Sequence, residues 1–142
     1  MIQYIEGIMC SGKTTLAKDL KKQGKKIAPE PTPPPLSETP SLEERQNAVF
    51  NSYVEHFEKY INEDEVYICD YSPWGVIPFE RALSRFSSQN GEPLVAQILD
   101  KLADRHDSIL KEKSQKWGNR CVMYLVKFLF KMNLLATFLI IS

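Results

Sequence analysis

One short segment near the start of the chain limits what it can fold into more than any other. Strand-forming residues at 1–6, MIQYIE, lead into residues 7–14, GIMCSGKT, which have the spacing G-x-x-x-x-G-K-[ST]. The two glycines allow backbone N–H groups to curve around an anion. Helix-forming residues follow at 14–22, so the positive end of the helix dipole would face the same anion. The pattern predicts a strand, a phosphate-binding loop and a helix.

The residues after the second glycine have chemical roles of their own. Lys13 brings a compact positive charge to the β- and γ-phosphates of a nucleotide, and Thr14 offers a hydroxyl to Mg²⁺. An ordinary glycine-containing turn is the alternative, and it does not account for this Lys and Thr. We therefore expect ATP and Mg²⁺ as ligands. The residues expected to bind ATP are Gly7, Ile8, Met9, Cys10, Ser11, Gly12, Lys13, Thr14 and Thr15.

Composition narrows the class of protein. A length of 142 residues predicts one domain, and a formal net charge of zero argues against a general nucleic-acid binder, which would carry a basic face. The three cysteines are widely spaced and fit neither a disulfide framework nor a zinc site. No signal-peptide pattern precedes the first strand. We expect a protein of the cytoplasm, or of the host cytoplasm if the source is viral.

Strand and helix patterns alternate along the chain. After the loop and its helix, further strands are expected at 25–28, 66–70 and 121–125, and helices at 41–61, 76–86 and 92–113. Strands that alternate with helices predict a parallel sheet. The expected fold is α/β, a three-layer phosphate-loop NTPase whose short parallel sheet is flanked by helices. It would occupy residues 1–125.

Local signals add detail to the helices. Ser41 and Glu44 have the spacing of a capping box at a helix start. The proline-dense segment 29–40 is either a linker or a rigid loop over the site. His56 and His106 lie among charged residues and are interpreted as surface histidines. The residues expected to face inward from the helix at 92–113 are Leu94, Ile98, Leu102 and Ile109.

Two acidic residues stand where predicted strands end. Glu30 follows the second strand and Asp70 closes the third. Either acid alone would be an ordinary surface residue. Ligands of an open parallel sheet, however, bind outside the carboxyl ends of its strands, where the phosphate loop also lies. Together they predict phosphoryl transfer, with Glu30 accepting a proton and Asp70 joining Thr14 as a ligand of Mg²⁺.

Three motifs together resemble the deoxynucleoside kinase family, which includes the viral thymidine kinases: residues 4–15, Glu30-Pro31, and CDYSP at 69–73. The resemblance implies that Glu30 is the general base for the sugar 5′-hydroxyl and that Gln46 pairs with the base. Phe50 and Tyr53 would stack on the base, although core packing explains these rings equally. The substrate-binding residues that the resemblance implies are Glu30, Gln46, Phe50, Tyr53, Asp70 and Val76, where Val76 leaves room for a pyrimidine.

The expected activity is ATP-dependent phosphorylation of a deoxynucleoside, thymidine or another pyrimidine, at its 5′-hydroxyl. Such a transferase would serve nucleotide salvage for DNA synthesis, and a homodimer is one expected form. Two alternatives stay open. One is a non-catalytic nucleotide-binding remnant, and the other is a nucleoside monophosphate kinase of the thymidylate type. Thymidine and thymidine monophosphate as acceptors would distinguish the two kinases.

The chain departs from the family pattern at two places. Tyr71 stands where the family has Arg, and tyrosine cannot supply a guanidinium fork. The family's arginine-rich lid has no counterpart after Arg120, where residues 126–142 form an apolar tail. The tail is interpreted as a buried terminal helix or strand, as an end that replaced the lid, or as a membrane anchor. The anchor is the weakest alternative, because the uncharged part after Lys131 is short for a span.

Overall fold

The computed structural model describes residues 2–6, 12–62, 64–117, 121–125 and 140–141. They form an α/β protein that divides into two compact units. The first unit holds the sheet and is drawn from residues 1–30, 57–72 and 117–142, and the second is drawn from residues 31–56 and 73–116. Helix α2 (Leu42–Ile61) contributes its last residues to the first unit and the rest to the second.

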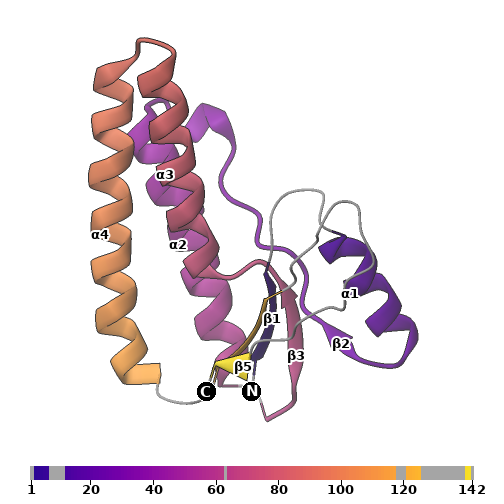
Figure 1. Cartoon of the computed structure of the whole chain (residues 1–142). Coiled ribbons are helices and arrows are strands. Elements are labelled where there is room, and N and C mark those ends of the chain that lie inside the picture. Colours follow the sequence, from indigo (N-terminus) through magenta and orange to yellow (C-terminus); the bar gives the residue numbers. More distant parts are fainter. Residues whose placement is uncertain (1, 7–11, 63, 118–120, 126–139, 142) are drawn as a thin grey trace. The chain divides into compact units, whose positions relative to one another are not determined.

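The sheet of the first unit has the order β2-β3-β1-β4-β5 (Figure 1). Strands β2, β3, β1 and β4 pair in parallel, and β5 pairs antiparallel with β4. The parallel pairing expected from the alternating pattern is confirmed. The strand bounds are β1 (Ile2–Glu6), β2 (Lys26–Ile27), β3 (Tyr67–Asp70), β4 (Cys121–Leu125) and β5 (Ile140–Ile141).

The register of these strands brings three carboxyl ends to one edge of the sheet. Ile5 of β1 lies opposite Asp70 of β3, and Ile27 of β2 lies opposite Ile68 of β3. The backbone N–H of Ala28 continues this pairing by donating to the Ile68 carbonyl at 2.9 Å. The segments that leave β1, β2 and β3 therefore start from the same edge.

Neighbouring residues of β1 pack on opposite faces of the sheet, as expected for a strand. Ile5 is 2% exposed and joins Ala17 of helix α1 (Lys13–Lys22) in one hydrophobic cluster. Tyr4 is completely buried, and its ring stacks on Phe57 of α2 with ring centroids 5.8 Å apart. Within the first unit, helical residues therefore cover both faces of the sheet.

Helix α1 ends where the sequence predicts. Gly24 has φ 82, a left-handed conformation that glycine adopts without a Cβ penalty. The N–H groups of Gly24 and Lys25 donate to the carbonyls of Lys21 and Leu20, both at 3.0 Å. These two bonds satisfy carbonyls that the helix itself leaves without partners. The chain then turns directly into β2.

The second unit is helical and contains a short 3-10 helix, η1 (Leu36–Glu38), most of α2, and helices α3 (Pro73–Gln89) and α4 (Pro93–Trp117). Helices α3 and α4 lie side by side and run in opposite directions (Figure 1). Gly91, with φ 79, forms the turn between them, and the Glu92 N–H donates to the Ser87 carbonyl at 2.9 Å. Of residues 87–91, which lie between the helices expected at 76–86 and 92–113, the first three belong to the last turn of α3.

The predicted capping box at the start of α2 is confirmed. The Ser41 hydroxyl accepts from the Glu44 N–H at 3.2 Å, and the Glu44 carboxylate accepts from the Ser41 N–H at 3.0 Å. Helix α3, in contrast, starts earlier than the expected Val76. It begins at Pro73, because the fixed φ and missing N–H of proline suit the first position of a helix.

The inward face predicted for α4 is partly wrong. Leu94 is 73% exposed and Ile98 is 38% exposed, whereas Leu102 is buried as expected and Ile109 is half-buried. The residues that α4 buries are Ala96, Leu99, Leu102, Ala103, His106 and Leu110. Hydrophobicity alone favoured the face with Leu94 and Ile98, because nothing in the pattern indicated that a histidine would face inward.

The apolar tail at 126–142 falls almost entirely outside the described residues. Only Ile140 and Ile141 are described, as strand β5. The three interpretations of the tail therefore remain predictions. None of the described helices combines the length and the apolar character that crossing a bilayer requires.

Candidate functional site

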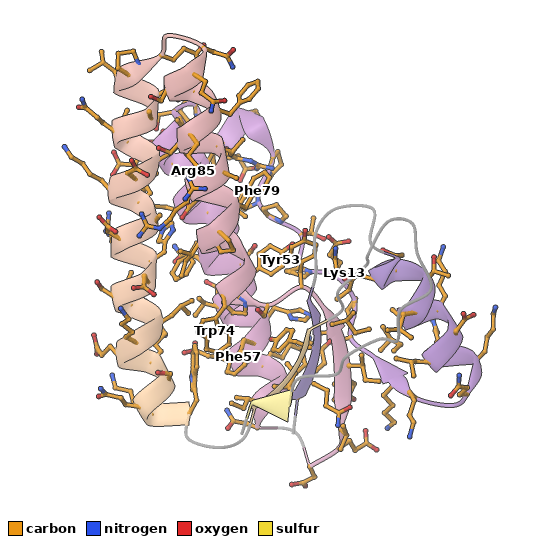
Figure 2. The ribbon with its side chains drawn as sticks, viewed as in Figure 1. Lys13, Tyr53, Phe57, Trp74, Phe79 and Arg85 are labelled. Carbon is orange, nitrogen blue, oxygen red and sulfur yellow. The ribbon has the colours of Figure 1, made fainter. Side chains whose placement is uncertain are left out.

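Helix α1 begins directly after a glycine in a left-handed conformation. Gly12 caps the helix in a left-handed conformation, with φ 86 and ψ 12, and its carbonyl accepts from the Leu16 N–H at 2.9 Å. Lys13 is the first residue of the helix and is only 6% exposed. Figure 2 shows it at the start of α1. The preceding candidates Gly7, Ile8, Met9, Cys10 and Ser11 lie outside the described residues.

Thr14 and Asp70 meet, although they are far apart in the sequence. The Thr14 hydroxyl donates to Asp70 Oδ2 at 3.0 Å. The other carboxylate oxygen, Asp70 Oδ1, is buried and has no hydrogen-bond partner among the residues that the structure describes. Thr15, the last residue predicted to bind ATP, is exposed on the first turn of α1. The contact joins the helix start to the end of β3.

This pair fits the ligand chemistry of Mg²⁺. The ion prefers oxygen ligands and is held in nucleotide sites by one or two protein groups together with phosphate oxygens and water. A hydroxyl beside a carboxylate with a buried, unpaired oxygen supplies such groups. Within the described ranges, no group of three or more His, Cys, Asp or Glu side chains could hold a metal ion by itself. A bound ion would therefore depend on phosphate oxygens for the rest of its ligands.

Tyr71, the residue after Asp70, has an unusual backbone. Its φ of 76 places it in the left-handed region, and it is the one non-glycine residue with positive φ in the described part of the chain. The Tyr71 N–H donates to the Ile5 carbonyl at 3.3 Å. Its ring lies over the Lys13 ammonium, with Nζ 4.7 Å from the ring centroid. The sequence did not predict this contact.

Glu30 lies just beyond β2, at the sheet edge that also carries Asp70 and the start of α1. Its side chain is exposed and forms no hydrogen bond or ion pair with any described residue. The carboxylate is therefore accessible to a ligand at that edge. The first unit thus contains Lys13, Thr14, Glu30 and Asp70, the residues predicted for phosphoryl transfer.

The residues predicted to bind the base belong to the second unit. Gln46 and Val76 are buried, and Tyr53 is half-buried. Phe50 is 2% exposed and stacks on the imidazole of His106, with ring centroids 3.9 Å apart and an angle of 7° between the rings. One face of the Phe50 ring is therefore already covered by protein.

A buried polar cluster in the second unit was missed by the sequence analysis. His106 is completely buried, so its interpretation as a surface histidine was wrong. Its Nδ1 lies 3.0 Å from both carboxylate oxygens of Glu80, which is also completely buried. Its Nε2 lies 3.1 Å from Asn47 Oδ1. Both ring nitrogens of His106 therefore lie within hydrogen-bond distance of a side-chain oxygen. The cluster links α2, α3 and α4.

Comparisons of the chain with protein-family models, with curated proteins and with solved structures find no match.

Proposed function

We propose that the protein transfers the γ-phosphoryl group of ATP to the 5′-hydroxyl of a deoxynucleoside, on a three-layer phosphate-loop NTPase fold. The observation that carries the proposal is the hydrogen bond between Thr14 and Asp70. It joins the last residue of a G-x-x-x-x-G-K-[ST] motif to an acid at the end of a neighbouring strand. A Mg²⁺-nucleotide site needs a hydroxyl and a carboxylate in this relation.

Each residue at this sheet edge has one task in the proposed reaction. Lys13 binds the β- and γ-phosphates, and the attraction is stronger because little of this residue is exposed to water. Thr14 and Asp70 hold Mg²⁺, which supplies positive charge against the phosphate oxygens. Glu30 accepts the proton of the 5′-hydroxyl as the O5′–P bond forms. The bond from the γ-phosphorus to the bridging oxygen breaks, and ADP leaves with that electron pair.

The choice of a deoxynucleoside as acceptor rests on the resemblance to deoxynucleoside kinases. Gln46 would pair with the base, and Val76 would border a pyrimidine. Of the two candidate stacking rings, Phe50 is buried and has one face stacked on His106, and Tyr53 is half-buried. Thymidine is therefore the first acceptor to test.

A second function is favoured by Tyr71. A residue that supplies no guanidinium at this position weakens the stabilisation of charge that develops on the transferring group. Binding of a nucleotide, in contrast, needs only the loop, Lys13 and the metal-binding pair. A protein that binds ATP without transferring phosphate is the second candidate.

The two candidates separate in one set of measurements. The wild type, Glu30→Gln and the control Glu55→Gln, which alters another exposed glutamate, are compared for ATP binding and for thymidine phosphorylation with ATP and Mg²⁺. The kinase predicts turnover that falls about a hundredfold or more in Glu30→Gln alone, at unchanged ATP affinity. Binding without turnover in the wild type identifies the second candidate. Failure of the wild type to bind ATP refutes both.

A further inference from the structure

The contact between Tyr71 and Lys13 depends on the left-handed backbone conformation of Tyr71, which the surrounding structure must stabilise. A side chain with a Cβ is disfavoured in the left-handed region, and residues held there are concentrated at functional sites. The residues on both sides of Tyr71 are fixed. Asp70 accepts from Thr14 at 3.0 Å, and Ser72 is completely buried. The Tyr71 N–H is held by Ile5. The backbone therefore directs the ring toward the start of α1.

The ring and the ammonium form a particular kind of pair. An aromatic face attracts a cation through its quadrupole, and the attraction is stronger where water is excluded. The Lys13 side chain is only 6% exposed, so this attraction is not strongly screened. A carboxylate in the same place would neutralise the ammonium and compete with phosphate. A ring restrains the ammonium without placing a negative charge beside it.

We propose that Tyr71 is a positioning residue, which holds the Lys13 ammonium in place for the phosphate groups of the nucleotide. This inference rests on the proposed function and adds a residue to it. The part of Tyr71 that acts is its aromatic face, so phenylalanine can replace it. Leucine keeps the apolar bulk but has no quadrupole. In Tyr71→Leu, the Lys13 ammonium is therefore expected to be more mobile and more hydrated.

The test compares the ATP affinity of the wild type, Tyr71→Phe and Tyr71→Leu by calorimetry. Tyr71→Leu is expected to weaken binding about three- to tenfold, and Tyr71→Phe is expected to match the wild type. The matched control is Tyr67→Leu, since Tyr67 begins the strand β3 that ends just before Tyr71, and its ring centroid lies 5.9 Å from the Lys26 ammonium. It should leave ATP affinity unchanged. Thermal unfolding of each variant identifies losses that come from misfolding.

A double-mutant cycle assigns the effect to Lys13. In a Lys13→Ala background, Tyr71→Leu should have no further effect on ATP affinity. A second readout needs no nucleotide, namely the rate at which an acylating reagent modifies Lys13, followed by mass spectrometry. That rate should rise in Tyr71→Leu and stay unchanged in Tyr71→Phe.

The outcomes that overturn the inference differ from those that overturn the proposed function. Equal ATP affinity in Tyr71→Leu and the wild type refutes the role of Tyr71 and leaves the nucleotide site standing. The role of Tyr71 is also refuted if Tyr71→Leu weakens ATP binding as much in the Lys13→Ala background as in the wild type. If the wild type does not bind ATP at all, the proposed function and the positioning role both fail. An unchanged acylation rate in Tyr71→Leu shows that the ring does not restrain Lys13.

Discussion

His106 and Glu80 form a completely buried pair between α4 and α3, with Nδ1 of the imidazole 3.0 Å from the carboxylate. Asn47 on α2 contacts the other ring nitrogen at 3.1 Å, and the Phe50 ring stacks on the imidazole. Charged side chains are rarely buried completely unless they have partners. The cluster therefore favours this packing of the three helices, because the imidazole of His106 would lose both of its partners if the helices moved apart.

We predict that Glu80→Ala lowers the free energy of unfolding by about 3–5 kcal/mol, because it leaves the His106 imidazole buried without its partner. Glu80→Gln should cost less, since its amide oxygen still accepts from Nδ1–H. Urea denaturation monitored by circular dichroism measures both. The control is Glu112→Ala, at an exposed glutamate of α4 paired with Lys116, which should cost about 1 kcal/mol or less. A similar small effect for Glu80→Ala would show that the pair does not support the fold.

The sheet could be predicted from the sequence for a physical reason. The strand at 67–70 is a short, mostly apolar run that ends on an acid, as in buried parallel strands, and the strand at 2–6 contains the strand-forming residues Ile2, Tyr4 and Ile5. The cap of α2 and the stop at Gly24 depend on local chemistry, so they too could be predicted. The face that α4 buries could not, because it depends on a partner on another helix. Glu80 was the available signal, since it shares a helix face with Val76 and Ser84.

The candidate site likewise has parts that could be predicted from the sequence and parts that could not. The proximity of Thr14 and Asp70 could be predicted, because a phosphate-loop motif and a strand end that carries an acid lie at the same edge of a parallel sheet. The conformation of Tyr71 could not, because the identity of a tyrosine does not indicate a positive φ. Its contact with Lys13 depends on the register of β1 and β3, where Ile5 lies opposite Asp70. Such contacts follow from the fold and become visible only with the structure.

The capping box of α2 should make stability depend on pH in the acid range. Hydrogen bonds from the Ser41 hydroxyl and from its N–H hold the pKa of Glu44 below its usual value. A carboxyl whose pKa is lowered by folding stabilises the protein above its unfolded pKa, and that contribution is lost as pH falls through the folded pKa. Glu44→Gln should therefore lower the urea midpoint at neutral pH. The difference from the wild type should shrink as pH falls below the usual carboxyl pKa of about 4.3 and should disappear only below the lower pKa that Glu44 has in the folded protein.

The matched control for this pH series is Glu55→Gln, at an exposed glutamate on the same helix. At each pH from neutral to acid, Glu55→Gln should have the same urea midpoint as the wild type. If Glu44→Gln shows a constant difference from the wild type at all pH values, the capping hydrogen bonds do not depend on the charge of Glu44.

The turn between α3 and α4 has room for a side chain at Gly91, but its backbone conformation disfavours any residue that has a Cβ. A Cβ built on Gly91 meets no atom within 4 Å, so steric clash is excluded. The residue has φ 79, however, where a side chain is disfavoured. Gly91→Ala should therefore lower the free energy of unfolding by about 1–2 kcal/mol, and Gly91→Asn by less. Equal losses for both variants in urea denaturation would show that backbone conformation is not the cause.

The last prediction concerns Asp70 and the metal dependence of nucleotide binding. Asp70→Asn removes the charge beside the Thr14 hydroxyl and keeps the shape of the side chain. It should weaken ATP binding about tenfold or more when Mg²⁺ is present and change it little in EDTA, because only the metal-bound nucleotide uses the carboxylate. Asp64→Asn, at an exposed aspartate before β3, is the control and should have no effect in either condition. Calorimetric titration with ATP under both conditions measures the difference. Equal weakening with and without Mg²⁺ would exclude Asp70 as a metal-binding residue, because loss of a metal ligand affects ATP binding only when the metal is present.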